Sequence, residues 1–138
     1  MVTGASRGIG KGIAEELGAA GATVFVTGRT VEAGAHPLPG TVGETAAAVD
    51  EAGGRGIALA CDHHVDGQVE AVFDRVLSEC GRLDVLVNNV FSSPAMVPWL
   101  GIPFWELPIE AWDETIDIGV RSHYVAARLA VPPRLATG

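Results

Sequence analysis

The stretch Thr3-Gly4-Ala5-Ser6-Arg7-Gly8-Ile9-Gly10 lies between a short apolar segment and a helical pattern near the start of the chain. Its glycines follow the spacing G-x-x-x-G-x-G, and each suits one need of a strand-turn-helix unit. Gly4 allows the tight turn, Gly8 the close approach of a ligand, and Gly10 the contact of the helix with the sheet. Backbone N–H groups at a helix start attract anions, so we expect this turn to hold the phosphates of a dinucleotide.

Short apolar runs on either side of this turn predict strands. Residues 22–27, 57–60 and 83–87 are β-branched or apolar, and Met1-Val2-Thr3 reads as the clipped end of a first strand. The run at 83–87 is nearly continuous, which is typical of a parallel strand covered on both faces. Residues 30–40 contain two prolines and two glycines and predict a loop.

Helical patterns alternate with these strands. Ile9, Ile13 and Leu17 recur every four residues and predict an amphipathic helix that Gly18 and Gly21 close. We expect further helices at 42–52, after an N-cap at Asp66, and at 109–131, where Pro132-Pro133 should forbid continuation. The helix after Asp66 has the clearest periodicity, carried by Val69, Val72, Phe73, Val76 and Leu77.

The alternation of strands with helices predicts βαβ units and a parallel sheet with helices on both faces. A length of 138 residues favours one domain or part of one. We therefore treat residues 1–138 as a single, partial dinucleotide-binding domain of the α/β class.

The amino-acid composition restricts the classes of partner and the cellular setting that we expect. The 9 basic and 17 acidic side chains give a formal net charge of -8, the wrong sign for binding nucleic acid or an anionic membrane by bulk charge. The apolar runs are too short for a membrane helix, and no signal-peptide pattern opens the chain. The two cysteines, Cys61 and Cys80, form no disulfide framework or zinc motif, so a cytoplasmic setting is expected.

The string TGASRGIG resembles the nucleotide-binding signature of the short-chain dehydrogenase/reductase (SDR) family. Asn88-Asn89 resembles the family's N-N-A-G element, and Cys61-Asp62 lies where the family places an aspartate against the adenine. The resemblance implies a truncated Rossmann-type doubly wound parallel sheet with strand order 3-2-1-4. It also implies that Asp62 contacts the adenine and that Asn88 and Asn89 lie on the ribose side. The phosphates would be held by Gly4, Ser6, Arg7, Gly8, Ile9 and Gly10.

Arg29 follows the second predicted strand, where an acidic residue would bind a ribose 2′-hydroxyl and a guanidinium can clamp a 2′-phosphate. In the family, basic residues here and just before the second glycine, as Arg7 is, accompany NADP(H). We therefore expect NADP, with NAD as the less favoured cofactor. The alternative is that both arginines are solvated surface charges.

The family's catalytic Ser and Tyr-x-x-x-Lys are missing from these residues, so no catalytic residue is assigned. Tyr124 and Arg128 have a similar spacing, but no strand lies between Asn89 and Tyr124 to supply the serine. Tyr124 is expected in the core or an interface, and Arg128 on a helix surface. Gly119 stands where the family often has an asparagine. Together with neighbouring motifs, this glycine makes the sequence similar to the member-1 branch of the animal dehydrogenase/reductase proteins.

The remaining candidates carry weaker expectations. His63 and His64 are adjacent and lack a second ligand cluster, so we predict no metal site and expect solvated loop side chains. Trp99, Phe104 and Trp105 either line a substrate pocket above the nicotinamide or pack under a long apolar loop.

The sequence thus predicts the N-terminal portion of an NADP(H)-dependent oxidoreductase acting on a small carbonyl or alcohol substrate, inactive in the form of these residues alone. The alternative from a different class is a non-catalytic nucleotide-binding or interaction module. A bare strand edge and an unpartnered last helix would favour association, so a homo-oligomer is possible with either function.

Overall fold

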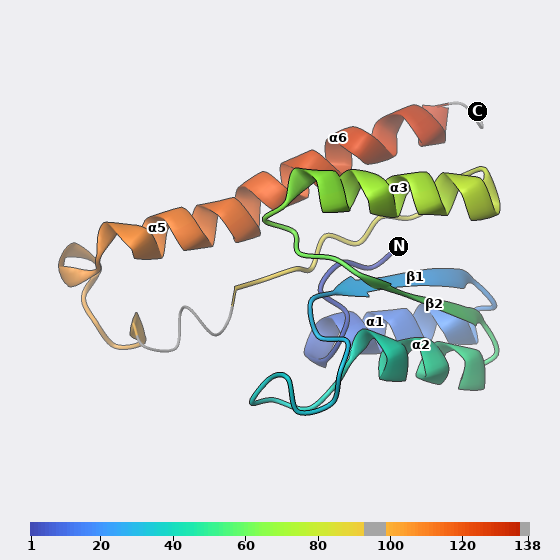
Figure 1. The fold of residues 1–138 in the computed structure, drawn as a ribbon, viewed down its shortest axis with the longest axis horizontal. Helices are drawn as coiled ribbons and strands as arrows, with labels where there is room; N and C mark the ends of the chain where they lie inside the picture. Colours follow the sequence, from blue (N-terminus) through green and yellow to red (C-terminus); the bar gives the residue numbers. More distant parts are fainter. Residues whose placement is uncertain (93–98, 136–138) are drawn as a thin grey trace.

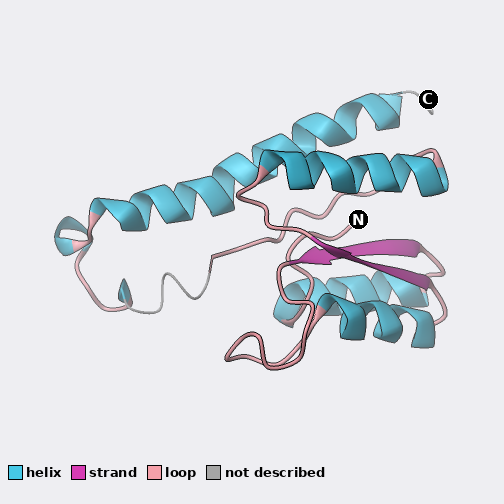
Figure 2. Cartoon of the chain, viewed as in Figure 1, coloured by secondary structure: helices cyan, strands magenta, loops and turns pink. Residues whose placement is uncertain are grey.

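The computed structural model describes residues 1–92 and 99–135, and within them helices lie on both faces of a small parallel sheet (Figures 1 and 2). Strands β1 (Thr23–Gly28) and β2 (Arg55–Ala60) pair in parallel, with Thr23 opposite Arg55 and Gly28 opposite Ala60. Helices α1 (Gly8–Ala19) and α2 (Val42–Glu51) cover one face, and α3 (Asp66–Cys80) and α6 (Ser122–Leu135) cover the other. The α/β class and the two-sided covering are confirmed.

The expected four-stranded sheet is only partly present. Val2 makes isolated parallel bridges to Val26 on one side and to Val87 on the other. The Val2 N–H donates to Phe25 O at 2.9 Å, and the Val87 N–H donates to Met1 O at 2.9 Å. Residues 1–3 are too few to extend this pairing into a strand. Val85 is 47% exposed, so the prediction that residues 83–87 are covered on both faces is wrong.

Side-chain alternation along β1 divides the core into two clusters. Val24 and Val26 point to the α1 and α2 face, whereas Phe25 points to the α3 and α6 face. The first cluster is built mainly from small side chains: Val2, Ala5, Ala14, Val24, Val26, Val42, Ala46 and Val49. The second contains Met1, Phe25, Cys61, Val69, Val72, Phe73, Val76, Leu83, Ala126 and Ala130.

The face that α1 buries matches the predicted one in part, because Ile13 and Leu17 pack against the first cluster but Ile9 does not. Gly10, Ala14 and Gly18 are its buried residues, whereas Ile9 is 78% exposed. Gly18 lies inside α1, which ends at Ala19, and its role is in packing, because a Cβ there would lie 2.9 Å from the backbone oxygen of Val49 on α2. Small side chains let α1 approach the sheet and α2 closely, and Ile13 and Leu17 pack beside them.

Helix ends also refine the predictions. The α2 helix begins at a capping box in which Thr41 Oγ1 accepts from Glu44 N–H at 3.0 Å and Glu44 accepts from Thr41 N–H at 2.9 Å. The sequence predicted Asp66 as the N-cap of α3. In the structure Asp66 is the first helical residue, and Val65 is the N-cap. The Asp66 carboxylate instead accepts two hydrogen bonds from Arg121, at 2.8 and 2.6 Å.

The predicted helix at 109–131 is segmented. It comprises α5 (Ile109–Ile116), a π-helical turn η3 (Asp117–Arg121) that contains Gly119, and α6, preceded by the 3-10 turn η2 (Phe104–Glu106). Pro132 and Pro133 lie inside α6, so the prediction that they end it is wrong. Each proline removes one i→i−4 hydrogen bond and crowds the carbonyl four residues before it, and because both lie in the last turn of α6 this cost is confined to that turn.

Candidate functional site

A cavity of about 520 Å³ opens at the carboxyl ends of β1 and β2, beside the start of α1. This is where ligands bind in open α/β sheets. Ten residues were predicted to bind the cofactor, and two of them, Gly8 and Asn88, do not line this cavity. The eight that line it are Gly4, Ser6, Arg7, Ile9, Gly10, Arg29, Asp62 and Asn89.

The glycine turn forms one wall of this cavity. Gly4 has φ +64°, and a Cβ there would lie 2.6 Å from the Cα of Val90, so both conformation and space exclude a side chain. Gly8 also has a positive φ, and open space surrounds the position of its missing side chain. The geometry matches the tight turn expected at Gly4 and leaves the room expected at Gly8.

Asn89 holds this turn in place. Its side-chain amide donates to Thr3 O at 2.9 Å and to Gly4 O at 3.0 Å, and its backbone N–H donates to Thr3 Oγ1 at 2.9 Å. Asn88 instead donates to the backbone oxygen of His123 on α6 at 3.3 Å. Both asparagines therefore fasten neighbouring segments, and Asn89 links the turn to the segment after Val87.

The N-terminus of α1 has no side-chain cap. Arg7 is the N-cap residue and has an extended backbone, and its side chain accepts no hydrogen bond from the helix. Ser6 is buried, and Ile9 and Gly10 of the first turn line the cavity. An uncapped helix start carries partial positive charge and free N–H groups, so this wall of the cavity can hold an anion.

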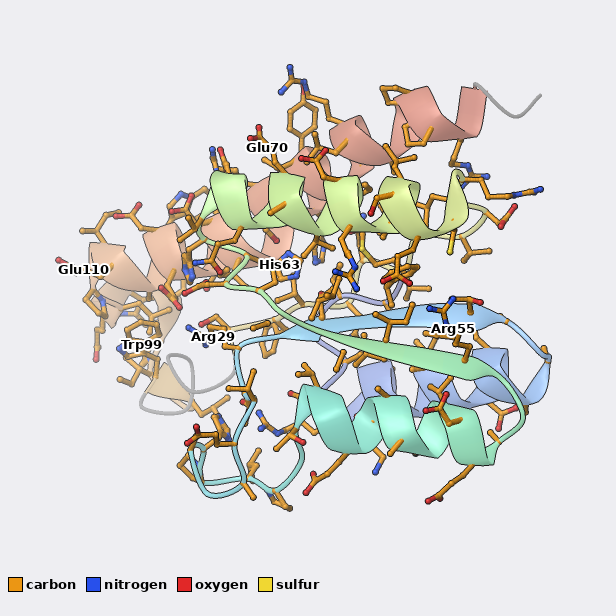
Figure 3. All side chains as sticks on the ribbon, turned by 45° about the vertical axis from the view of Figure 1, so that its right-hand side comes forward. Arg29, Arg55, His63, Glu70, Trp99 and Glu110 are labelled. Atoms are coloured by element: carbon orange, nitrogen blue, oxygen red, sulfur yellow. The ribbon has the colours of Figure 1, made fainter. Side chains whose placement is uncertain are left out.

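The two predicted phosphate-reading arginines differ in their surroundings. The Arg7 guanidinium donates to Pro39 O at 3.1 Å, Thr30 Oγ1 at 3.0 Å and Gly40 O at 2.7 Å. Arg29 is exposed at the end of β1, with its side chain in the cavity lining (Figure 3). Only Arg29 therefore keeps its guanidinium outside the hydrogen-bond network of the described residues.

Asp62 lines the cavity across from the glycine turn. Partial burial raises the pKa of its carboxyl, but hydrogen bonds donated by His64 and the charge of Arg29 outweigh burial and hold the pKa below its usual value. The His64 ring lies 3.1 Å from Asp62 Oδ1 and 3.4 Å from Glu114 Oε2 on α5. Glu114 also accepts a hydrogen bond from Ser92. His64 therefore connects the cavity wall to α5.

His63 departs from its prediction as a solvated loop residue. It is 2% exposed and lies between the sheet and α3 (Figure 3), where its Nε2 is 2.9 Å from Thr27 Oγ1. Burial lowers the pKa of His63 to about 4, and no partner for its Nδ1 lies among the described residues. A signal was present, because Ile57, Leu59, Cys61 and His63 continue the strand's period of two.

The aromatic residues of the long loop lie apart from this cavity. Phe104 and Trp105 are 79% and 71% exposed and meet edge to face, with ring centroids 5.4 Å apart. Trp99 and Phe104 line a second, apolar cavity beside α5 that shares no lining residue with the first. Trp99 and Phe104 therefore line a pocket separate from the cofactor cavity, and the exposed Phe104 and Trp105 do not pack under the loop as the second alternative expected.

Tyr124 and Arg128 form no site with the cavity. Tyr124 is 69% exposed on α6, so it does not lie in the core, and the alternative that it lies in an interface stays a prediction. Neither side chain belongs to the cavity lining. Arg128 is exposed, as expected. Residues 1–92 and 99–135 contain no cluster of three His, Cys, Asp or Glu side chains arranged to hold a metal. None of their helices is long and apolar enough to cross a membrane.

A glycine turn, an uncapped helix start and a cavity at the carboxyl edge of a parallel sheet define the class of Rossmann-type, dinucleotide-binding α/β proteins. Comparison with known proteins is more specific: a family model described as enoyl-(acyl carrier protein) reductase matches residues 4–138. The chain belongs to the SDR family of oxidoreductases.

Individual relatives agree with this assignment. Mouse dehydrogenase/reductase SDR family member 1 is 42% identical over 138 residues, which is 96% of this chain and 42% of the relative's length. The predicted resemblance to the member-1 branch is therefore confirmed. The chain spans less than half of this relative, and the match lies in the relative's N-terminal part.

Solved structures of the family superimpose closely. A metagenomic short-chain oxidoreductase, solved in complex with NADP, has a TM-score of 0.82 and 34% identity, covering 99% of this chain and 56% of that one. A short chain dehydrogenase from Mycobacterium thermoresistibile has a TM-score of 0.82 and 30% identity, covering 95% and 44%.

Proposed function

We propose that the chain is the nucleotide-binding part of an NADP(H)-dependent oxidoreductase. The observation that supports this most directly is the uncapped start of α1, which faces a cavity with Arg29 in its lining. An anion placed at the helix start and a second anion beside Arg29 would complement this charge distribution. The NADP complex of the metagenomic relative supports the same cofactor class.

The roles within the cavity are part of the proposal. Backbone groups of the glycine turn would bind the diphosphate, through Gly4, Ser6, Arg7, Gly8, Ile9 and Gly10. Arg29 would bind the ribose 2′-phosphate and Asp62 the adenine. Asn89, with Asn88 beside it, would position the turn against the ribose side.

Bound NADP(H) supplies hydride for reduction of a carbonyl or accepts it from an alcohol. The residues of the glycine turn and the cavity wall would bind and orient the cofactor. The only tyrosine, Tyr124, is followed four positions later by Arg128 and not by a lysine. We therefore propose that the whole protein, and not this chain by itself, transfers hydride to or from a small carbonyl or alcohol substrate.

A non-catalytic nucleotide-binding module is the second candidate, because the glycine turn and the cavity support nucleotide binding without requiring catalysis. The two candidates differ in the whole protein, because only an oxidoreductase consumes NADPH when offered carbonyl compounds. Oxidation of NADPH, followed by the loss of its absorbance, would support the first candidate. Binding without turnover over a broad carbonyl panel would support the second.

Several architectural and cellular features remain part of the proposal. We propose that residues 1–138 form one partial domain. In the whole protein its four strand segments would lie side by side in the order β2, β1, residues 1–3 and residues 83–87, which is the predicted order 3-2-1-4. The exposed Val85 edge and the exposed Trp112 and Tyr124 support association with a second copy. Free thiols at Cys61 and Cys80 are compatible with a cytoplasmic location.

Isothermal titration of the protein with NADPH and with NADH tests the cofactor. We expect saturable binding of NADPH, at least tenfold tighter than that of NADH. Equal or tighter binding of NADH would overturn the NADP assignment. Failure of both nucleotides to bind protein whose melting is cooperative would overturn the proposed function.

A further inference from the structure

The segment between β1 and α2 is a closed loop that folds back onto the glycine turn (Figure 1). Its two ends meet, because Val42 N–H donates to Thr30 O at 3.0 Å. Gly40 has φ +112°, and a side chain there would overlap the backbone oxygen of Ser6. Residues 30–42 therefore form an Ω-type loop, a kind of segment that is often functional. We refer to it as the clasped loop.

Arg7 fastens the clasped loop. Its guanidinium reaches both ends of the loop, through the Thr30 hydroxyl and the backbone oxygens of Pro39 and Gly40. These bonds use Nε and Nη2, so neither two-nitrogen edge of the guanidinium is free for a bidentate phosphate contact, and only the donors of Nη1 remain. In this chain Arg7 therefore acts on the loop, and a group of the loop itself can act beside Arg29.

The clasped loop brings one imidazole to the cavity. Ala35, His36 and Leu38 join Arg29 and Thr30 in the cavity lining. The Leu38 N–H donates to His36 Nδ1 at 3.0 Å. Because Nδ1 accepts this bond, the neutral ring carries its proton on Nε2, which is then a hydrogen-bond donor.

We propose that His36 is a specificity-determining residue that, with Arg29, binds the 2′-phosphate of NADP(H), and that Arg7 is a positioning residue that holds the loop carrying His36. This inference rests on the proposed function, since it assumes that the adenosine half of the cofactor occupies this cavity. A hydrogen bond donated to a dianionic phosphate is a strong one, and losing it weakens binding about tenfold.

A purely structural role is the competing explanation for His36, because its Nδ1 accepts from Leu38. The variant His36→Asn separates the two roles. Its side-chain oxygen sits near the place of Nδ1 and can still accept from Leu38, but the Nε2 donor is lost. The variant His36→Gln reverses the exchange, since its amide nitrogen reaches farther and can replace Nε2 as a donor.

Titration with adenosine 2′,5′-bisphosphate and with adenosine 5′-monophosphate tests the proposal without any turnover. The unsubstituted protein should prefer the bisphosphate. We expect His36→Asn to weaken bisphosphate binding about tenfold while binding of the monophosphate stays within twofold, and His36→Gln to restore most of the loss. Arg7→Met should lower the same preference and increase protease cleavage within residues 30–42, because the loop loses its clasp.

Three outcomes contradict the proposal in distinguishable ways. Unchanged preference in His36→Asn, with Arg29→Ala still reducing it, would remove His36 from the phosphate site and leave the proposed function intact. An equal loss for both ligands would mean that His36 serves only the loop structure. Failure of the unsubstituted, cooperatively melting protein to bind either adenosine phosphate would overturn the proposed function and this inference together.

Discussion

The side-chain amide of Asn89 lies where a side chain at Gly10 would begin, so the segment after Val87 and the first turn of α1 share one tightly packed position. A Cβ at Gly10 would also lie 2.7 Å from Gly4 O. The turn, the helix start and Asn89 therefore form one unit. A substitution in any of the three should therefore displace the other two.

Substitution Gly10→Ala tests this unit. The new methyl group must displace Asn89 or the turn backbone, and such overpacking costs about 1–3 kcal/mol of unfolding free energy. We expect a lower denaturant midpoint and weaker NADPH binding. Gly12→Ala is the matched control on the same helix, because open space surrounds its missing Cβ. It should be neutral or stabilise by about 0.5–1 kcal/mol. Equal effects of the two variants would contradict this tight packing at Gly10.

Local signals predicted the turn and most helices well. Gly4 and Gly8 reflect positive-φ backbone conformations within a short turn, and the periodicity of α3 reports its buried face directly. Pairing partners were harder to predict. The segments at Val2 and Val87 meet through bonds between distant parts of the chain, and no local pattern states how many residues will pair.

The missed site features have specific physical causes. The buried face of α1 carries glycine and alanine, so a search for large apolar residues selects Ile9 instead. The Arg7 bonds depend on how the loop at 30–42 folds back, which glycine and proline content does not specify. His63 was missed because the predicted strand ended at residue 60, whereas its side-chain alternation continues.

The pH dependence of stability should report His63. Burial lowers the pKa of this imidazole from 6.5 to about 4, with Asp62 opposing and His123 reinforcing the shift. Between these pH values the unfolded chain binds a proton that the folded chain does not, so stability falls as pH drops from about 6.5 to about 4. The loss should reach about 3 kcal/mol and then level off.

Chemical denaturation at several pH values measures this effect. His63→Gln serves as the comparison, because glutamine can still bond Thr27 and does not titrate. Asp62 also titrates in the acid range, so the difference between the two proteins isolates His63. Parallel stability curves across this range would show that His63 is not held neutral by burial.

Thiol reactivity should distinguish the two cysteines. Cys61 is 1% exposed, and burial, reinforced by the charge of Asp62, raises its pKa to about 11. Cys80 is half-buried at the end of α3. A maleimide or aromatic disulfide reagent should modify Cys80 first in the folded protein and both thiols after denaturation. Cys80→Ser should therefore remove the fast phase, and a remaining fast phase would contradict the burial of Cys61.

Charge reversal at Arg29 should change the cofactor preference. Arg29→Asp places a carboxylate where it repels a 2′-phosphate and can accept a hydrogen bond from a ribose 2′-hydroxyl. We expect NADPH binding to weaken by tenfold or more and NADH binding to strengthen by a smaller factor, both measured by fluorescence titration. Arg128→Asp is the matched control, because Arg128 is exposed on α6 and outside the cavity lining. If both variants weakened NADPH binding equally, the effect would come from net charge, and Arg29 would lose its assignment as the phosphate-binding residue.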